Sequence, residues 1–64
     1  MLIAKCKAIK SLDRKNLAAE IALFLNSLAD DIMKEAKVEI TTINSKNNEY
    51  VHFAYIIYFV EEEE

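Results

Sequence analysis

The chain has 64 residues and a net charge of −3, contains no glycine and no proline, and carries a single cysteine, Cys6, and a single histidine, His52. This composition excludes an internal disulfide, a four-ligand zinc site built by one chain, and the glycine-rich phosphate loops of nucleotide-binding folds. We expect one domain at residues 1–60, followed by an acidic tail at 61–64, with no metal and no cofactor. A domain this small is only marginally stable, so a partner subunit is expected to stabilise it.

The first predicted element is a strand over residues 2–9 with two distinct faces. One face carries Leu2, Ala4, Cys6 and Ala8, and the other carries Ile3, Lys5, Lys7 and Ile9. The small neighbours of Cys6 favour a core position for its side chain. The two lysines favour an edge strand, because lysine discourages unwanted pairing between sheets.

A single helix is predicted over residues 14–34, with Ser11 or Asp13 available to cap its first turn. Apolar residues recur at spacings of three and four and form one stripe, namely Leu17, Ile21, Phe24, Leu25, Leu28 and Ile32. Asp30 and Asp31 would lie late in this helix, where the helix dipole disfavours them. They are interpreted as part of a solvated face rather than as a metal site.

Two further strands are predicted, "KVEITTI" at residues 37–43 and "YVHFAYIIYFV" at residues 50–60. The loop between them, at residues 44–49, contains Asn47 and Asn48, either of which can adopt the left-handed conformation that glycine would otherwise supply. The predicted fold is α+β with the order β-α-β-β, a three-stranded sheet with one helix on one face. If the first strand runs parallel to the second through a right-handed crossover, the third strand lies between them.

The last strand is apolar on both faces. Val51, Phe53, Tyr55, Ile57 and Phe59 alternate with His52, Ala54, Ile56, Tyr58 and Val60. One helix can cover only one of these faces, and the sequence does not decide which. The other face would leave a large apolar patch, so we expect a homodimer or higher oligomer that packs sheet against sheet or sheet against a partner's helix. The alternative is an exposed aromatic face that binds another protein.

The candidate ligand-binding residues are basic and aromatic. Lys5, Lys7 and Arg14 are predicted to contact phosphates near the start of the helix, and His52 or Tyr58 to lie beside a base. Tyr55 is the alternative stacking residue. The competing interpretation is that the cations serve solubility and edge protection. We do not expect duplex nucleic acid as a ligand, because the chain is acidic overall and its basic set is small.

No enzymatic activity is predicted. A catalytic His52 would need a nucleophile and an orienting group within hydrogen-bond reach, and nothing in the sequence places Cys6 beside it. A cytoplasmic location is expected, since a lone cysteine fits a reducing compartment, no secretory signal is recognisable, and no apolar run is long enough to span a membrane.

The arrangement of "IAKCKAI", "LAAEIALFLNSL", "KVEITTI" and "YVHFAYIIYF" resembles the small sporulation proteins of bacilli that are made in the mother cell. The resemblance covers nearly the whole chain as a pattern of hydrophobic positions. The chain departs from that family in its basic first strand, where an acidic turn is expected soon after, and in its four C-terminal glutamates. Similar small folds occur in phages of bacilli, where very short proteins act as sponges that sequester nucleotide signals of host immunity.

Two functions follow as expectations. The first is a non-enzymatic, homo-oligomeric binding module, a phage anti-defence sponge for a small anionic nucleotide. The alternative is a small structural or adaptor protein of sporulation that binds another protein through its apolar sheet face. For the first function the expected partners are further copies of the chain and a small nucleotide ligand. For the alternative the partner is another protein, and neither function involves a membrane.

Overall fold

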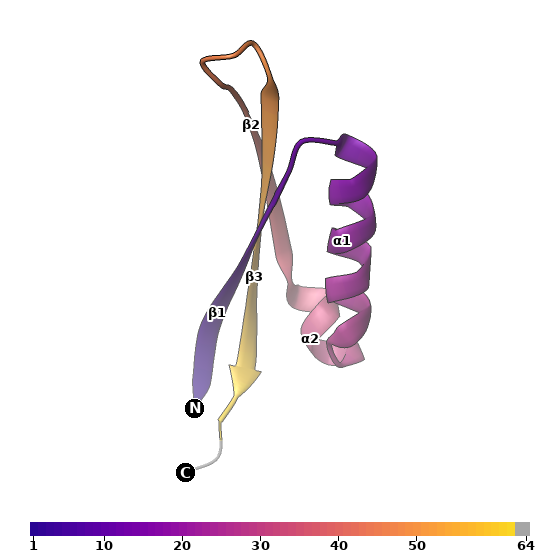
Figure 1. Ribbon diagram of the computed structural model, residues 1–64. Coiled ribbons are helices and arrows are strands. Elements are labelled where there is room, and N and C mark those ends of the chain that lie inside the picture. The colour runs from indigo at the N-terminus through magenta and orange to yellow at the C-terminus, as the bar shows by residue number, and fades with distance from the viewer. Residues whose placement is uncertain (63–64) are drawn as a thin grey trace.

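The computed structural model describes residues 1–62 and contains a sheet with two helices packed on one side (Figure 1). In chain order the elements are β1 (Leu2–Ser11), α1 (Arg14–Ser27), α2 (Asp30–Glu35), β2 (Lys37–Asn44) and β3 (Tyr50–Glu61). None of the helices in the described residues is long and apolar enough to cross a membrane.

The sheet has the strand order β1-β3-β2, with β3 antiparallel to both neighbours. The predicted α+β class and the central position of the most apolar strand are therefore confirmed. Because β1 and β2 both run opposite to β3, they are parallel to each other. Ala54 of β3 lies between Ile9 of β1 and Ile40 of β2, which fixes the register of all three strands.

The prediction of a single helix is wrong, because the chain leaves helical geometry at Leu28 and Ala29. Both residues are extended, with ψ of 153° and 150°, respectively. The hydroxyl of Ser27 donates a hydrogen bond to the Phe24 carbonyl, a local bond that competes with the regular helical pattern. The break redirects the chain so that the short helix α2 packs against β3.

The break also corrects the interpretation of Asp30 and Asp31. They form the first turn of α2 rather than a late turn of a long helix. Carboxylates near a helix N-terminus interact favourably with the helix dipole, and Lys34 in the last turn does the same at the other end. The acidic pair therefore favours a new helix start at this point.

The hairpin between β2 and β3 uses the predicted asparagine chemistry. Asn48 has a φ of 60°, the left-handed conformation, and its N–H donates to the Ser45 carbonyl at 3.1 Å. The Ser45 N–H in turn donates to the Glu49 carbonyl at 2.7 Å. Asparagine tolerates this conformation better than most residues, which is how a chain without glycine closes a tight hairpin.

The helices cover the face of β3 that carries His52, Ala54 and Ile56. Ala54 and Ile56 have no exposed surface, and together with Ile9 and Leu17 they form the buried core. Half-buried side chains from α1, from β3 and from the residue that follows α2 pack around this core, namely Ile21, Phe24, Leu25, Tyr58 and Ala36. The question of which face meets the helices, which the sequence left undecided, is thereby answered.

The opposite side of the sheet, here called the open face, is covered by no element of the described residues. The register assigns to it Leu2, Ala4, Cys6, Ala8 and Lys10 of β1, Lys37, Glu39, Thr41 and Ile43 of β2, and Val51, Phe53, Tyr55, Ile57 and Phe59 of β3. The expectation that Cys6 is a core residue is wrong, because its side chain is exposed on this face. Ile9 takes the core position instead, since α1 packs against the other face of β1.

The molecule is elongated, with extents of 48 × 18 × 15 Å and a radius of gyration of 13.8 Å. A compact chain of this length has a radius of gyration of about 11 Å. The accessible surface of 5149 Å² also exceeds the roughly 4,200 Å² expected for a folded monomer of this mass. A single copy thus leaves more of its surface exposed than a globular monomer does.

The expected acidic tail begins inside the sheet. Glu61 is the last residue of β3 and pairs with Leu2 of β1. Glu62 also belongs to the ladder, since its N–H donates to the Met1 carbonyl at 3.0 Å. The remainder of the predicted tail, Glu63 and Glu64, lies outside the described residues.

Replacing Ile56 with alanine is expected to lower the free energy of unfolding by about 2–5 kcal/mol, because the substitution opens a cavity at the centre of a very small core. The matched control is Leu23→Ala on α1, where the leucine is 72% exposed and the change should be within about 0.5 kcal/mol. Chemical denaturation followed by circular dichroism, at one protein concentration, measures both. Equal effects of the two substitutions would contradict the assigned core.

Candidate functional site

Two hollows flank α1, one on each side of the contact between this helix and the sheet. The first hollow has a volume of about 500 Å³ and lies between α1 and β1. The second has a volume of about 270 Å³ and lies between α1 and the strands β2 and β3. Their existence follows from packing one narrow helix along a three-stranded sheet.

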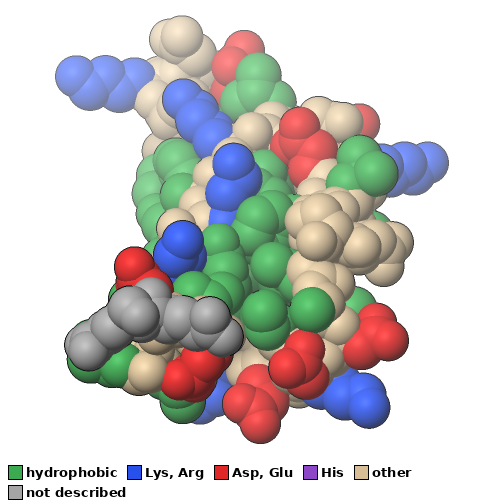
Figure 2. Space-filling view, turned by 90° about the horizontal axis from the view of Figure 1, so that it is seen from below, with side chains coloured by type: hydrophobic (Ala, Val, Ile, Leu, Met, Phe, Trp, Pro, Cys, Tyr) green, Lys and Arg blue, Asp and Glu red, His purple; other side chains and the backbone are tan. Residues whose placement is uncertain are grey.

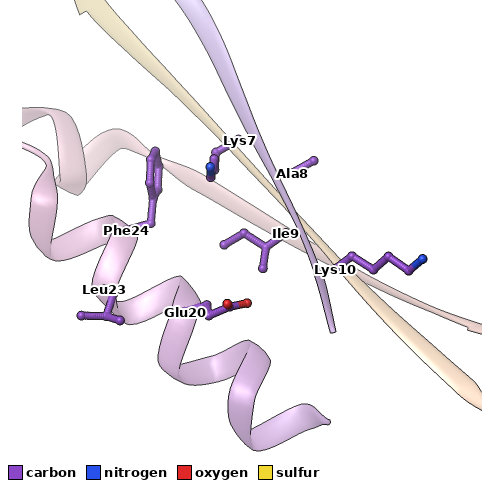
Figure 3. A pocket seen from close by; sticks show the side chains of 7 residues that line it. All are labelled: Lys7, Ala8, Ile9, Lys10, Glu20, Leu23 and Phe24. Carbon is purple, nitrogen blue, oxygen red and sulfur yellow. The ribbon is translucent and has the colours of Figure 1, made fainter. Parts of the chain in front are cut away.

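The first hollow combines cationic and aromatic side chains. Its lining residues are Lys7, Ala8, Ile9, Lys10, Glu20, Leu23 and Phe24. Figure 3 shows that Lys7 and Ile9 point from β1 toward α1, whereas Ala8 and Lys10 point to the other side of the strand. The ammonium nitrogen of Lys7 lies 6.0 Å from the centroid of the Phe24 ring, at the limit of a cation–π contact.

An aromatic pair adjoins Lys7. The rings of Phe24 and Tyr58 have centroids 5.4 Å apart and an interplanar angle of 59°, which is the tilted geometry that aromatic pairs favour. Tyr58 is also the register partner of Lys5 on the central strand. Lys5, Lys7 and Tyr58 therefore share the helix-side face of the sheet, near Phe24. Of these four, sequence reasoning missed only Phe24, which it assigned to the apolar stripe alone.

Basic side chains also gather along one side of the molecule. Figure 2, which views the protein from below, shows an apolar surface in the centre with Lys and Arg side chains in a row along one side and acidic side chains around the near rim. In the first hollow Glu20 is the one acidic lining residue. A phosphate would accordingly be favoured at the Lys7 side and disfavoured beside Glu20.

The second hollow holds two of the predicted residues, Arg14 and His52. Of the other three, only Lys7 lines the first hollow, while Lys5 and Tyr58 lie beside it on the same face of the sheet. The second hollow has an apolar lining of Leu17, Ala18, Ile21 and Ile40, with Thr42 beside His52. The five predicted ligand residues are therefore distributed over both sides of α1 and do not line one hollow. Arg14 is the first residue of α1, whose N-terminus is capped by Asp13 through a 3.0 Å bond from the Lys15 N–H.

His52 is held in place by Thr42. The histidine is 6% exposed, and its Nδ1 lies 2.9 Å from the hydroxyl oxygen of Thr42. The hydroxyl donates to Nδ1 or accepts from it, according to the tautomer. Cys6 lies on the open face while His52 lies on the helix side, so these two side chains cannot act together as a nucleophile and a base.

Comparison of the chain with protein-family models, with curated proteins and with solved structures gave no match. The interpretation of the two hollows therefore rests on their own side chains. The resemblance to sporulation proteins of bacilli remains an expectation from the sequence. Within residues 1–62 no group of three or more His, Cys, Asp and Glu side chains is placed to hold a metal ion.

Replacing Thr42 with valine is expected to lower the free energy of unfolding by about 1–3 kcal/mol, because the buried Nδ1 of His52 would lose its hydrogen-bond partner. Thr41→Val is the matched control. Thr41 lies on the open face and has no such bond, and valine is at least as good a strand former as threonine. Denaturation curves that coincide for the two variants would show that the bond contributes nothing.

Proposed function

We propose that this protein is a non-enzymatic, homo-oligomeric binding module that sequesters a small anionic nucleotide. The observation that carries the proposal is the first hollow, where the Lys7 ammonium lies beside the Phe24 ring in an open space of about 500 Å³. Small-molecule sites typically have volumes of about 300–1,000 Å³ and combine apolar walls with a few polar groups.

The ligand would bind with its two ends in different surroundings. Its phosphates would meet Lys7 and the neighbouring Lys5, and its base would lie against Phe24 or Tyr58, because every base offers a flat face for stacking. The Glu20 carboxylate would accept a hydrogen bond from a ribose hydroxyl or a base amino group and would repel a phosphate. Arg14 and His52 would offer a separate, smaller anion contact in the second hollow.

Sequestration needs no chemical step. A ligand held by an abundant protein is unavailable to its receptor, so only affinity and copy number determine the effect. The proposed setting is the cytoplasm of a bacterium, where such a module would act as a phage anti-defence sponge. The features that support this setting are the cationic hollow and the small size of the chain, in which it is analogous to the phage sponges described above.

The proposal includes homo-oligomerisation through the open face. Large apolar side chains lie exposed there, among them Leu2, Ile43, Tyr55 and Phe59, with exposed fractions between 39% and 64%. Phe53 and Tyr55 also stack, with centroids 6.5 Å apart and an interplanar angle of 11°. Two such faces packed together would bury aromatic and aliphatic side chains in the manner of a β-sandwich.

The same face supports one alternative function. An adaptor of sporulation would dock a different protein on the open face and would have no use for the first hollow. The two functions are distinguished by what the purified protein carries. A sponge retains a nucleotide, whereas an adaptor retains a protein that is lost when Tyr55 and Phe59 are replaced with serine.

Replacing Lys5 and Lys7 together with alanine is expected to weaken nucleotide binding by about tenfold or more, since two phosphate contacts are lost. Isothermal titration calorimetry with a panel of nucleoside mono-, di- and triphosphates and cyclic nucleotides measures the change. The double variant Lys37→Ala and Lys46→Ala is the matched control. It removes the same net charge from β2 and the hairpin loop, away from the first hollow.

The result that contradicts the proposal is an unchanged affinity in the Lys5 and Lys7 variant. An equal loss in both double variants would also contradict it, because the effect would then reflect net charge rather than a site. Circular dichroism of each variant confirms that the fold is retained.

A further inference from the structure

Strand β2 is an unprotected edge of the sheet. It is one of the two outer strands in the order β1-β3-β2, and all eight of its residues are exposed, while the helices make their main contacts with β1 and β3. Five of the eight are β-branched, namely Val38, Ile40, Thr41, Thr42 and Ile43. Long, regular edge strands of this kind are templates for pairing with another chain.

The two edges of the sheet differ in their protection. The outer strand β1 carries Lys5, Lys7 and Lys10, and lysine on an edge discourages further pairing. In β2 the only lysine is Lys37, the first residue of the strand, and the middle of the strand has none. Pairing with a further strand is therefore favoured at β2 over β1.

The hairpin shows which backbone groups of β2 are free. The Ser45 N–H bonds to the Glu49 carbonyl, and the register continues from there with Ile43 opposite Val51 and Thr41 opposite Phe53. Because hydrogen-bonded and non-hydrogen-bonded pairs alternate in an antiparallel ladder, the odd-numbered residues of β2 bond to β3. The N–H and C=O groups of Val38, Ile40, Thr42 and Asn44 point outward.

This outward set is self-complementary. In an antiparallel pair of β2 strands centred on Ile40, each Ile40 faces its own copy and Val38 faces Thr42. About six backbone hydrogen bonds would form between these residues. Ile40, which is 59% exposed in one copy, would be covered by its equivalent. On the open face, Glu39 would lie opposite Thr41, so no like charges would meet.

A neighbouring register is less favourable. Moving the centre of symmetry to Glu39 would place the two Glu39 carboxylates directly opposite each other, which is destabilising. Moving the centre of symmetry to Thr41 would separate the two Ile40 side chains, and each would then face Thr42 of the other copy. The register centred on Ile40 is the one that joins the exposed apolar side chains and avoids a charge clash.

We propose that two copies of this chain pair edge to edge through β2, antiparallel and centred on Ile40, to form one six-stranded sheet. Ile40 and Thr42 also line the second hollow, so the partner's strand would extend the floor of that hollow beside His52. The two-fold axis of this pairing is normal to the sheet. Packing of two open faces would use a second two-fold axis, perpendicular to the first. The β2 pairing and the open-face packing can therefore coexist, and together they would give a closed tetramer.

Single cysteines test the register directly. In a Cys6→Ser background, Ile40→Cys places two thiols opposite each other, with Cα atoms about 5.5 Å apart, within the range of a disulfide. Thr42→Cys is the matched control on the same face of the same strand. In the proposed register the two copies of residue 42 are offset by four residues, or about 13 Å, which is beyond disulfide reach.

Mild oxidation followed by non-reducing electrophoresis measures cross-linking. The expected result is a covalent dimer from Ile40→Cys, formed at least about tenfold faster than from Thr42→Cys. A mixture of Val38→Cys and Thr42→Cys proteins should also cross-link, because these two positions face each other. That second pair tests the same register if Ile40→Cys lowers stability, which circular dichroism reports.

Two results overturn the proposal. Equal cross-linking of Ile40→Cys and Thr42→Cys would indicate random collision between exposed thiols. Failure of both the Ile40→Cys variant and the mixed pair to cross-link, in proteins that retain the fold, would show that β2 does not pair with itself. Neither result depends on nucleotide binding, so each is independent of the proposed sponge function.

Discussion

The structure depends on a central strand that needs cover on both sides. β3 is hydrogen-bonded along both edges, and its two faces are apolar, but the helices can cover only the side of Ala54 and Ile56. The other side, with Phe53, Tyr55 and Phe59, stays open. Burial of apolar surface is the main driving force of folding and association, so a second chain on the open face, as proposed above, would stabilise the domain.

The candidate site arises from the same arrangement. On β1 the helix-side face carries Ile9, which joins the core, and next to it the cations Lys7 and Lys5. The helix lies over Ile9 and leaves room beside it, so that Lys7 reaches the Phe24 ring. Packing of a narrow helix on a wider sheet thus produces a hollow whose walls are part core and part cationic edge.

Much of the fold could be predicted from the sequence, because its strands have strong period-two patterns and β-branched residues. The central place of β3, the lysine-bearing edge and the asparagine turn all follow from local chemistry. The helix break at Leu28 and Ala29 could not be predicted from periodicity, since the apolar spacing continues through it. The acidic pair that begins α2 was the available signal.

The position of Cys6 was predicted wrongly because alternation identifies two faces but does not say which one meets the helix. The five predicted ligand residues do not form one site for a related reason, because a sequence pattern does not specify on which side of the helix each strand lies. Lys7 lines the first hollow, Arg14 and His52 line the second, and Lys5 and Tyr58 line neither.

Whether a second copy covers the open face of β3 is tested by native mass spectrometry of the untagged protein, purified from cells that make nucleotide signals, at micromolar concentration. The 7.4 kDa chain is expected to form a dimer or a larger even-numbered assembly, part of which carries a discrete nucleotide-sized adduct. An oligomer without an adduct would support the shared open face and oppose the sponge. A monomer throughout would contradict the claim that a second copy covers the open face of β3.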